Sequence, residues 1–212
     1  QVAPPLKNSL QEGLCSQEIH KWSLAVRKQW EEKGVTNVTG LNKFIAETPF
    51  PDVRSISESM NANILDSIAN QIISKLPERR VISIAGPSSS GKTTISDPIK
   101  RKLQEKGYKC AIITTDDYFV DRADMIPNAE GKLEFESINA VLTDMLESRI
   151  ETLLNGGEVP YRKFDFHSGT GSDSNEKFSV GENGVVIIEG IHGINPELLC
   201  HLGKAKPQTI YV

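Results

Sequence analysis

Gly86-Pro87-Ser88-Ser89-Ser90-Gly91-Lys92-Thr93 is the stretch that decides the fold of this 212-residue chain. It fits the pattern G-x-x-x-x-G-K-[ST], a loop whose backbone N–H groups cradle phosphates. Gly86 and Gly91 permit backbone torsions that are closed to other residues, so successive N–H groups can converge on an anion. Lys92 places positive charge on the outer phosphates, and Thr93 offers a hydroxyl to Mg²⁺. The motif therefore predicts a nucleotide-phosphate site.

The residues on either side of this loop have the character that the motif requires. Residues 80–85 form a short apolar run, as expected for a buried parallel strand. Residues 93–106 place apolar side chains at helical spacing, with Gly107 as the stop and Pro98 as the predicted site of a kink. This framing argues against a flexible Gly/Ser linker. The nucleotide-binding residues that we predict are Gly86, Ser88, Ser89, Ser90, Gly91, Lys92, Thr93 and Thr94.

The composition is that of an ordinary globular protein, with 38% hydrophobic and 25% charged residues. A net charge of −4 argues against a dedicated nucleic-acid-binding protein. No apolar stretch approaches the ~20 residues that span a bilayer, and no signal peptide is visible. The 3 cysteines are an odd number without metal-ligand spacing, and Cys110 and Cys200 fall in apolar stretches, which indicates packing residues in a reducing compartment. We therefore expect a cytoplasmic protein without a membrane partner. Because the chain starts at Gln1 and ends in an apparent strand, we also expect a fragment of a longer protein.

The N-terminal part of the chain differs in character from the rest. We predict that residues 1–54 are mainly helical and form the end of an N-terminal extension. A helix capped by Ser16 and stopped by Gly34 should be followed by a short helix around residues 41–45. A proline-rich joint at residues 48–52 then precedes Ser55, which opens a capping box and hence a connector helix over residues 55–77.

Strands and helices alternate in the remaining residues, 78–212. We predict strands at residues 81–85, 110–114, 185–188 and 208–212. A helix capped by Ser137 should end at Gly156 and Gly157, and the polar segment 168–175 should be a mobile loop. This order predicts an α/β fold, a mostly parallel sheet flanked by helices as in P-loop nucleotide-binding proteins.

Acidic residues follow two of the predicted strands. Asp116 and Asp117 follow the second strand, and Glu189 ends the third. Ligands of such sheets bind beyond the carboxyl ends of the strands, so we expect these carboxylates near Mg²⁺ and the outer phosphates. We expect Asp116 to lie one strand over from the phosphate loop and to face the site, while Asp117 points away. Such an arrangement is typical of phosphoryl transfer.

The motifs also occur together in one known family. In order, the chain contains Gly86–Thr93, then Thr114-Thr-Asp-Asp-Tyr-Phe-Val-Asp-Arg122, then Phe164-Asp-Phe166 and finally Ile187-Ile-Glu-Gly-Ile-His192. This series resembles the phosphoribulokinase/uridine kinase family over residues 78–212. Residues 1–77 resemble the end of the threonyl-tRNA-synthetase-like extension carried by some uridine-kinase-like proteins.

The resemblance implies roles for individual residues. It implies that Asp116 is the catalytic base, acting together with Lys92. The metal ligands that it implies are Thr93, Asp116 and Glu189, which would hold Mg²⁺. The substrate-binding residues that it implies are Tyr118, Phe119, Glu136, Phe164 and His167. It assigns no role to Asp117.

The sequence also departs from the family pattern. Leu133-Glu-Phe-Glu-Ser137 stands in place of the usual Asn-Phe-Asp-His-Pro, and the arginine-bearing lid would lie beyond Val212. The leading hypothesis is an ATP- and Mg²⁺-dependent kinase of a nucleoside hydroxyl, with the 5′-hydroxyl of uridine or cytidine as acceptor. The alternatives are a kinase of another small alcohol, such as pantothenate or a sugar phosphate, and a non-catalytic nucleotide-binding regulatory protein. A homo-oligomer is compatible with the sequence, and nucleic acid is not an expected partner of the kinase core.

Overall fold

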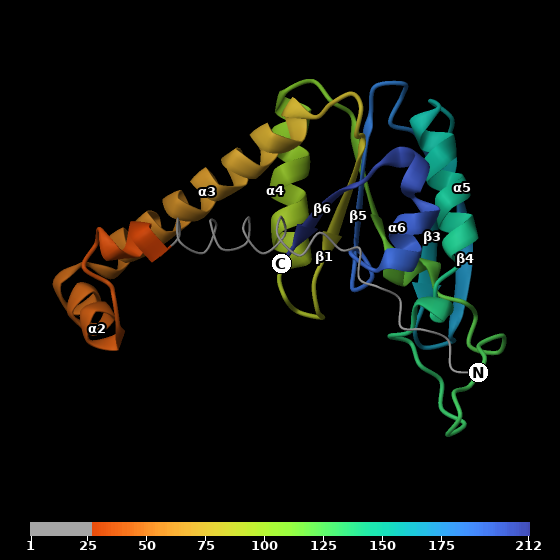
Figure 1. Ribbon diagram of the computed structural model, residues 1–212, viewed down its shortest axis with the longest axis horizontal. Coiled ribbons are helices and arrows are strands. Elements are labelled where there is room, and N and C mark those ends of the chain that lie inside the picture. Colours follow the sequence, from red (N-terminus) through yellow and green to blue (C-terminus); the bar gives the residue numbers. More distant parts are fainter. Residues whose placement is uncertain (1–26) are drawn as a thin grey trace, which may run out of the picture. The chain divides into compact units, whose positions relative to one another are not determined.

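A computed structural model describes residues 27–212 of the chain (Figure 1). The protein divides into two compact units, one that ends at Asn63 and one that comprises Ile64–Val212. The division falls inside the long helix α3, Phe50–Ser74. That residues 1–54, 55–77 and 78–212 behave as separate domains stays a prediction.

The first unit is helical in its described part. The predicted helix over residues 16–34 lies mostly outside the described residues, and its described part is helical over residues 27–31. The predicted second helix is confirmed as α2, Val38–Glu47. Its N-cap is Asn37, whose side chain accepts a hydrogen bond from the backbone N–H of Gly40. Trp30 packs edge-to-face on Phe44, with 6.2 Å between the ring centroids.

The start of the connector helix was predicted wrongly. Helix α3 begins at Phe50, so Ser55 lies inside it and is not its N-cap. Pro51 is tolerated because the N–H groups of a first helical turn have no partner within the helix. The carbonyl of Pro49 accepts from the N–H groups of Asp52 and Val53 and closes that first turn. The proline-rich segment therefore includes the first turn of α3, and its first residues connect α2 to α3.

The predicted fold class is confirmed by a parallel sheet of four strands in the second unit. The strands are β1 (Val81–Ala85), β2 (Cys110–Thr114), β5 (Val185–Gly190) and β6 (Gln208–Tyr211), in the spatial order β2-β5-β1-β6. Each predicted strand is therefore present. One expectation was wrong: β5 lies between β1 and β2, so the residues after β2 are two strands away from the phosphate loop and not one.

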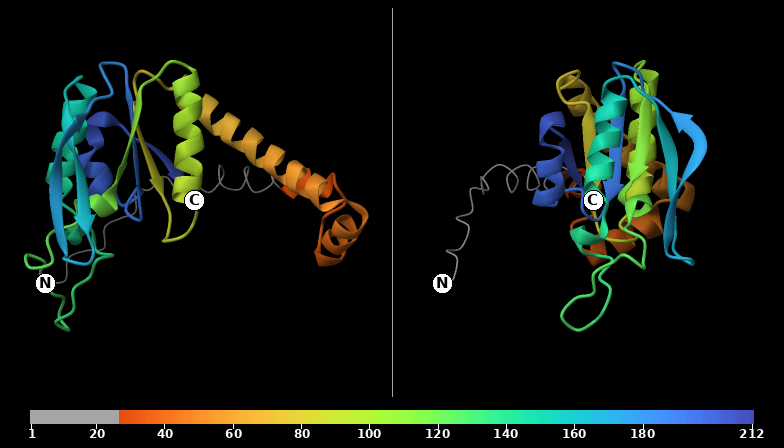
Figure 2. Two further views of the ribbon diagram at one scale, coloured as in Figure 1. Left: turned by 180° about the vertical axis from the view of Figure 1, so that it is seen from behind. Right: turned by 90° about the vertical axis from the view of Figure 1, so that its right-hand side faces the viewer.

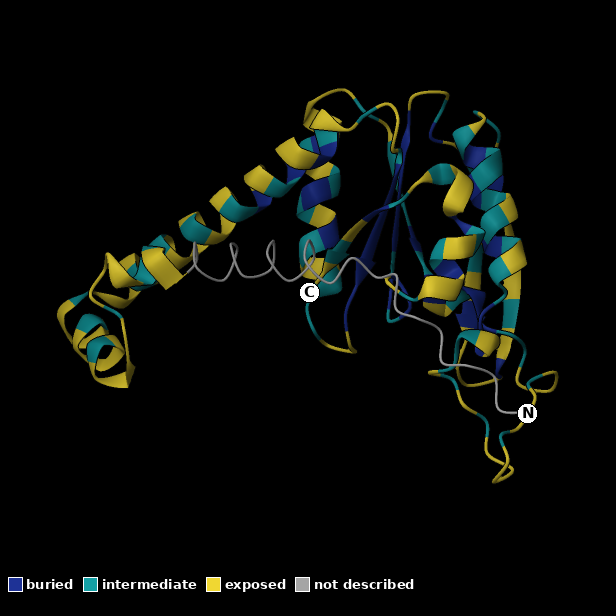
Figure 3. Cartoon of the chain, in the orientation of Figure 1, coloured by how far each residue is buried: buried dark blue, intermediate teal, exposed yellow. Residues whose placement is uncertain are grey.

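Helices cover both faces of this sheet. On one face lie α4 (Lys92–Glu105) and the part of α3 that belongs to this unit, which share an apolar cluster with Ile82, Ile84 and Ile187. On the other lie α5 (Thr143–Leu154) and α6 (Pro196–His201), which pack on Val186 and Ile188. Figure 1 shows the sheet between α4 and the pair α5 and α6, and Figure 3 shows β1 and β5 as buried strands. Because successive side chains of a strand point to opposite faces, each central strand contributes apolar residues to both clusters.

The polar segment that was predicted to be a mobile loop is a strand. Residues 170–178 form β4 (Thr170–Phe178), which pairs antiparallel with β3 (Val159–Asp165). The hairpin lies beside α5 in both of the opposed views (Figures 1 and 2). Because most of β4 is exposed, it lacks the apolar alternation that reveals a strand. Its Asp173 accepts hydrogen bonds from Arg149 and Arg162, which hold the strand to its neighbours.

Ser137 caps a shorter element than expected. Its hydroxyl accepts from the N–H of Asn139 and starts a single 3₁₀ turn, η2 (Ile138–Ala140), whereas α5 begins at Thr143. The backbone between them pairs with the residues after β2, because Val120 donates to Ala140 and Leu142 donates to Tyr118. This tertiary pairing delays the helix by about one turn. The predicted stop is confirmed, since α5 ends at Leu154 and Gly156 has φ of 81°.

Helix α4 continues through Pro98 without interruption and ends before Gly107, whose φ of 88° confirms it as the helix stop. Two further short 3₁₀ turns complete the unit, η1 (Thr115–Tyr118) and η3 (Gly203–Ala205). Within residues 27–212, no helix has both the length and the apolar character that crossing a membrane requires.

The contact between α4 and the sheet predicts a measurable loss of stability. Leu103 is completely buried in the cluster under β1 and β5, so Leu103→Ala should lower the free energy of unfolding by about 2–5 kcal/mol. The matched control is Gln104→Ala on the exposed side of the same helix turn, which should change it by less than about 0.5 kcal/mol. Urea unfolding followed by circular dichroism measures both. Equal losses in the two variants would contradict this packing.

Candidate active site

The phosphate loop lies at the carboxyl end of β1 and leads directly into α4. Gly91 precedes the helix with φ of 93°, and Ser89 also has a positive φ of 61°. A side chain at Gly86 would place its Cβ 2.5 Å from Ser90 Oγ and 2.7 Å from the carbonyl oxygen of Val212. Only glycine therefore fits at position 86, and the loop can fold tightly enough to turn its N–H groups inward.

The loop offers an anion a lysine, a buried hydroxyl and the N–H groups of a helix start. The side chain of Lys92 folds over the loop, and its Nζ donates to the carbonyl oxygens of Gly86 and Pro87 at 3.0 and 2.8 Å. Ser90 Oγ is buried and has no hydrogen-bond partner among the described residues. An unpaired buried hydroxyl costs free energy that a bound phosphate would recover. The first turn of α4 adds unpaired N–H groups and the positive end of the helix dipole. The loop therefore fits a nucleotide polyphosphate.

Glu189 is brought to this loop by the register of the sheet. Residue 189 pairs with Ile84 of β1 on one side and with Thr114 of β2 on the other. Its Oε1 accepts from Thr93 Oγ1 at 3.2 Å, so the hydroxyl and the carboxylate that were predicted to bind Mg²⁺ are neighbours. Oxygen donors of this kind suit Mg²⁺, which prefers carboxylates and hydroxyls together with water and substrate phosphates. The donor set therefore fits this ion.

Ser96 is a site residue that sequence reasoning missed. It is fully buried on α4, and its Oγ lies 2.7 Å from Glu189 Oε2, where it donates to the carboxylate. The signal was present in the sequence: Ser96 shares a helix face with Ile99 and Leu103, where a polar side chain has to find a partner.

Asp116 and Asp117 lie in the turn η1 and point to different surroundings. Asp116 is exposed to solvent on one side. The protein excludes water from its other side, and this partial desolvation of the carboxylate raises the pKa of Asp116. The positive charge of Lys92 opposes this effect, while the charges of Asp117 and Glu189 add to it. Asp116 is therefore within electrostatic reach of both the phosphate-loop lysine and the predicted metal ligand, as a residue at a phosphoryl-transfer site should be.

Asp117 has a visible structural role. Its Oδ2 accepts from Lys163 Nζ at 2.9 Å, and its Oδ1 accepts from the backbone N–H of Phe164 at 3.3 Å. The residue thus ties η1 to the β3–β4 hairpin. Asp121 and Arg122 extend this connection, because Asp121 Oδ1 accepts from the N–H of Gly171 and Arg122 donates to the carbonyl oxygen of Phe166.

The predicted aromatic residues gather in one cluster but are mostly covered. Tyr118, Phe119 and Phe164 are only 3%, 5% and 6% exposed. Phe119 contacts Phe164 edge-to-face with 5.6 Å between centroids, and the 54% exposed Phe166 packs on both. Phe166 therefore presents the cluster's most open face, and it was not among the predicted contact residues. The contact of the other three with a nucleoside stays a prediction.

The other predicted substrate-binding residues are exposed. Glu136 lies just before η2, and its charge reaches His192. His167 lies in the turn between β3 and β4, where its backbone N–H donates to Asp165. His192 was quoted in a motif but given no role. It is 6% exposed, its Nε2 has no partner among the described residues, and burial lowers its pKa although Asp116 and Glu136 oppose that effect.

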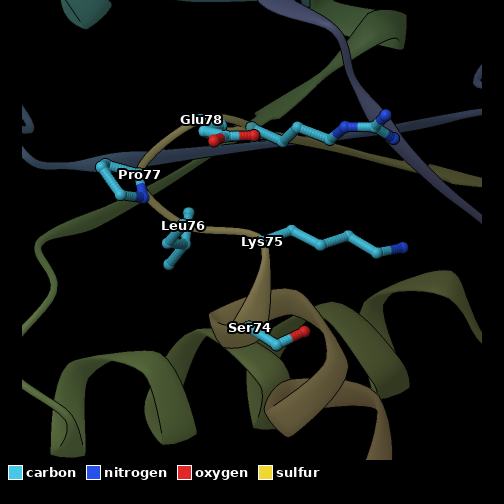
Figure 4. Close-up of a pocket in the computed structure, with 6 residues that line it drawn as sticks. Ser74, Lys75, Leu76, Pro77 and Glu78 are labelled. Carbon is cyan, nitrogen blue, oxygen red and sulfur yellow. The ribbon is translucent and has the colours of Figure 1, made fainter.

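Two other features of the described residues lie away from this site. A surface pocket of about 500 Å³ is lined by residues 74–79, between the end of α3 and the start of β1 (Figure 4). It therefore lies near the amino end of the strand whose carboxyl end carries the phosphate loop. Asp144, Glu147 and His201 form a partly exposed cluster on α5 and α6, in which His201 Nδ1 lies 3.1 Å from Glu147.

The loop geometry predicts that Lys92 carries much of the nucleotide affinity. A charge-assisted contact contributes about 1.5–3 kcal/mol, so Lys92→Ala should weaken ATP binding by about ten- to a hundredfold. Lys106→Ala, which removes the same charge at the opposite end of α4, should change it less than about twofold. Isothermal titration calorimetry measures both. Unchanged affinity in Lys92→Ala would refute the assignment.

Comparison with known proteins agrees with this geometry. Uridine kinase from Staphylococcus aureus (strain JH9) is 30% identical over 132 residues, which cover 62% of this chain and 60% of that protein. The chain thus spans about 60% of the length of these curated relatives. A solved structure described as a "Possible Uridine Kinase" from Bacillus stearothermophilus shares the fold, with 22% identity, a TM-score of 0.55, and coverage of 73% of this chain and 80% of that one. The model of the phosphoribulokinase/uridine kinase family matches residues 81–202, more than half of the chain. The chain belongs to the phosphoribulokinase/uridine kinase family.

Proposed function

We propose that this protein is a kinase that transfers the terminal phosphoryl group of ATP to a hydroxyl group of a small molecule. The observation that carries the proposal is the position of Asp116 within electrostatic reach of Lys92 and Glu189 at the carboxyl edge of one sheet. Membership of the family implies the use of ATP. The acceptor with the most support is the 5′-hydroxyl of uridine or cytidine, because the curated relative is a uridine kinase and an aromatic cluster adjoins Asp116.

The proposed reaction uses the residues in distinct roles. The phosphate loop and Lys92 hold the β- and γ-phosphates, while Thr93 and Glu189 would hold Mg²⁺. The ion, when bound, neutralises charge on the transferred group. The acceptor oxygen forms a bond to the γ-phosphorus as the bond from that phosphorus to the bridging oxygen of ADP breaks. Asp116 accepts the proton of the acceptor hydroxyl.

The raised pKa of Asp116 matters for this role. A base with a pKa above that of an ordinary aspartate is a better proton acceptor, and it loses activity as the pH falls through that raised value. The same raised pKa makes stability depend on pH in the opposite sense, so that it falls where activity rises. Because the folded state holds the proton more tightly than the unfolded state, the contribution of Asp116 is most favourable below the unfolded pKa and is lost as the pH rises through the folded pKa.

Replacing Asp116 therefore predicts a split between activity and stability. In the full-length protein, Asp116→Asn should lower turnover by about 10²-fold or more. ATP should still bind, and the free energy of unfolding at neutral pH should stay the same or rise, because a partly buried charge is removed. Steady-state kinetics, calorimetry and urea unfolding measure these three quantities.

Asp117→Asn is the matched control for that variant. It keeps an oxygen that can accept from the Phe164 N–H and loses only the charge that pairs with Lys163. Its turnover should fall much less than that of Asp116→Asn. The reverse order, with Asp117→Asn inactive and Asp116→Asn active, would show that the base had been assigned to the wrong residue.

The substrate itself is tested by ADP release from the full-length protein with a panel of acceptors. Uridine and cytidine should stimulate release well above the rate without acceptor. Release with pantothenate or ribulose 5-phosphate alone would replace the nucleoside proposal with a kinase of that alcohol. Tight ATP binding without release for any acceptor would instead favour a regulatory nucleotide-binding protein. That residues 1–77 end a threonyl-tRNA-synthetase-like extension remains a proposal from sequence resemblance.

A further inference from the structure

Ser96 stands where a hydroxyl group has no structural need to be. It lies in the second turn of α4, completely buried, on the helix face that packs against the sheet through Ile99 and Leu103. A serine at such a position usually satisfies its hydroxyl on a carbonyl of the preceding turn. Here the oxygen of that carbonyl, on Thr93, is 3.4 Å away, whereas Glu189 Oε2 is 2.7 Å away.

The hydroxyl of Ser96 therefore donates its one hydrogen bond to the carboxylate of Glu189. An ionised carboxylate only accepts hydrogen bonds, so Ser96 has to be the donor in this contact. A hydrogen bond to a charged group is about twice as strong as one between neutral groups. Because Ser96 is completely buried, water has little access to the donor side of this bond, and the hydroxyl restrains the position of one carboxylate oxygen.

The two oxygens of Glu189 thus have separate partners. Oε2 is held by Ser96, and Oε1 lies 3.2 Å from Thr93 Oγ1. Ser96 and Thr93 both lie on α4, the helix that begins at the phosphate loop, whereas Glu189 lies on β5. One helix therefore contacts both oxygens of a carboxylate that belongs to the sheet.

We propose that Ser96 is a positioning residue that holds the Glu189 carboxylate in the orientation required for Mg²⁺ binding next to Thr93. The inference deepens the proposed function and rests on its metal site. Ser96 would itself contact neither the ion nor the substrate, because its hydroxyl is used by Glu189. It acts on the metal through Glu189, as groups that hydrogen-bond metal ligands do in other proteins, where their loss typically lowers metal affinity about 10- to 100-fold.

The test compares Ser96→Ala with a matched variant that loses an equally buried hydroxyl on the other face of the same sheet. Ser83 is that control, because it is completely buried in β1 and donates to the carbonyl oxygen of Gly193 at 2.7 Å. Both substitutions remove one oxygen atom and leave little empty space. Calorimetry of the full-length protein gives ATP affinity without metal and over a series of Mg²⁺ concentrations, and urea unfolding gives the stability of each variant.

Ser96→Ala should raise the Mg²⁺ concentration that half-saturates the gain in ATP affinity by about tenfold. Its metal-free ATP affinity should stay within about twofold of the wild type. Ser83→Ala should lose stability but keep the wild-type Mg²⁺ dependence. Ser96→Thr, which retains the hydroxyl, should keep the wild-type Mg²⁺ dependence. Its unfolding curve checks that the added methyl group leaves the variant at least as stable as Ser96→Ala.

Three results would overturn the inference. An unchanged Mg²⁺ requirement in Ser96→Ala would show that Glu189 needs no support from α4. An equal rise of the Mg²⁺ requirement in Ser96→Ala and Ser83→Ala would show that this rise comes from loss of core stability and not from the orientation of the carboxylate. A wild-type protein whose ATP affinity does not respond to Mg²⁺ would overturn the proposed metal site and this inference with it. Because these readouts are binding measurements, they are independent of whether any acceptor supports ADP release.

Discussion

The parallel pairing of β5 with β1 is the constraint on which the rest of the site depends. It sets Glu189 opposite Ile84, one residue before the end of β1, so the carboxylate meets the helix that follows the phosphate loop. The pairing of β5 with β2 sets Thr114 on the other side of Glu189 and places η1 at the same edge. A strand slipped by one residue would turn Glu189 towards the other face. One register therefore brings the phosphate loop, Glu189 and Asp116 together.

Several polar groups at this edge of the sheet lower the free energy of unfolding, because burial removes water from them and no other group among the described residues replaces it. Ser90 Oγ and His192 Nε2 are buried without partners in the described part of the chain. Asp116 has a raised pKa because the protein covers part of its surface. The stability that tolerates these costs comes from the apolar clusters on the two faces of the sheet, where Ile82, Leu103 and Leu146 are completely buried. Groups with unmet interactions gathered at one edge are what a binding site requires.

Much of this arrangement could be predicted from the sequence, because apolar runs and glycines signal local structure directly. The strands around residues 81–85 and 110–114, the phosphate loop and the stop at Gly107 depend on neighbouring residues only. The prediction failed where tertiary contacts decide. Strand β4 is polar and is held by pairing with β3 and by arginines at 149 and 162, and the insertion of β5 between β1 and β2 has no local signal. Ser96 was overlooked because its partner lies 93 residues away.

A crystal structure with a non-hydrolysable ATP analogue, Mg²⁺ and uridine is the most direct test of the central claim, that one edge of the sheet assembles a phosphoryl-transfer site. The account predicts the γ-phosphate against Lys92 and Asp116 within about 2.6–3.2 Å of the uridine 5′-hydroxyl. It also predicts the metal beside Thr93 and Glu189. Phosphates bound away from the loop 86–93, or Asp117 at the hydroxyl in place of Asp116, would contradict it.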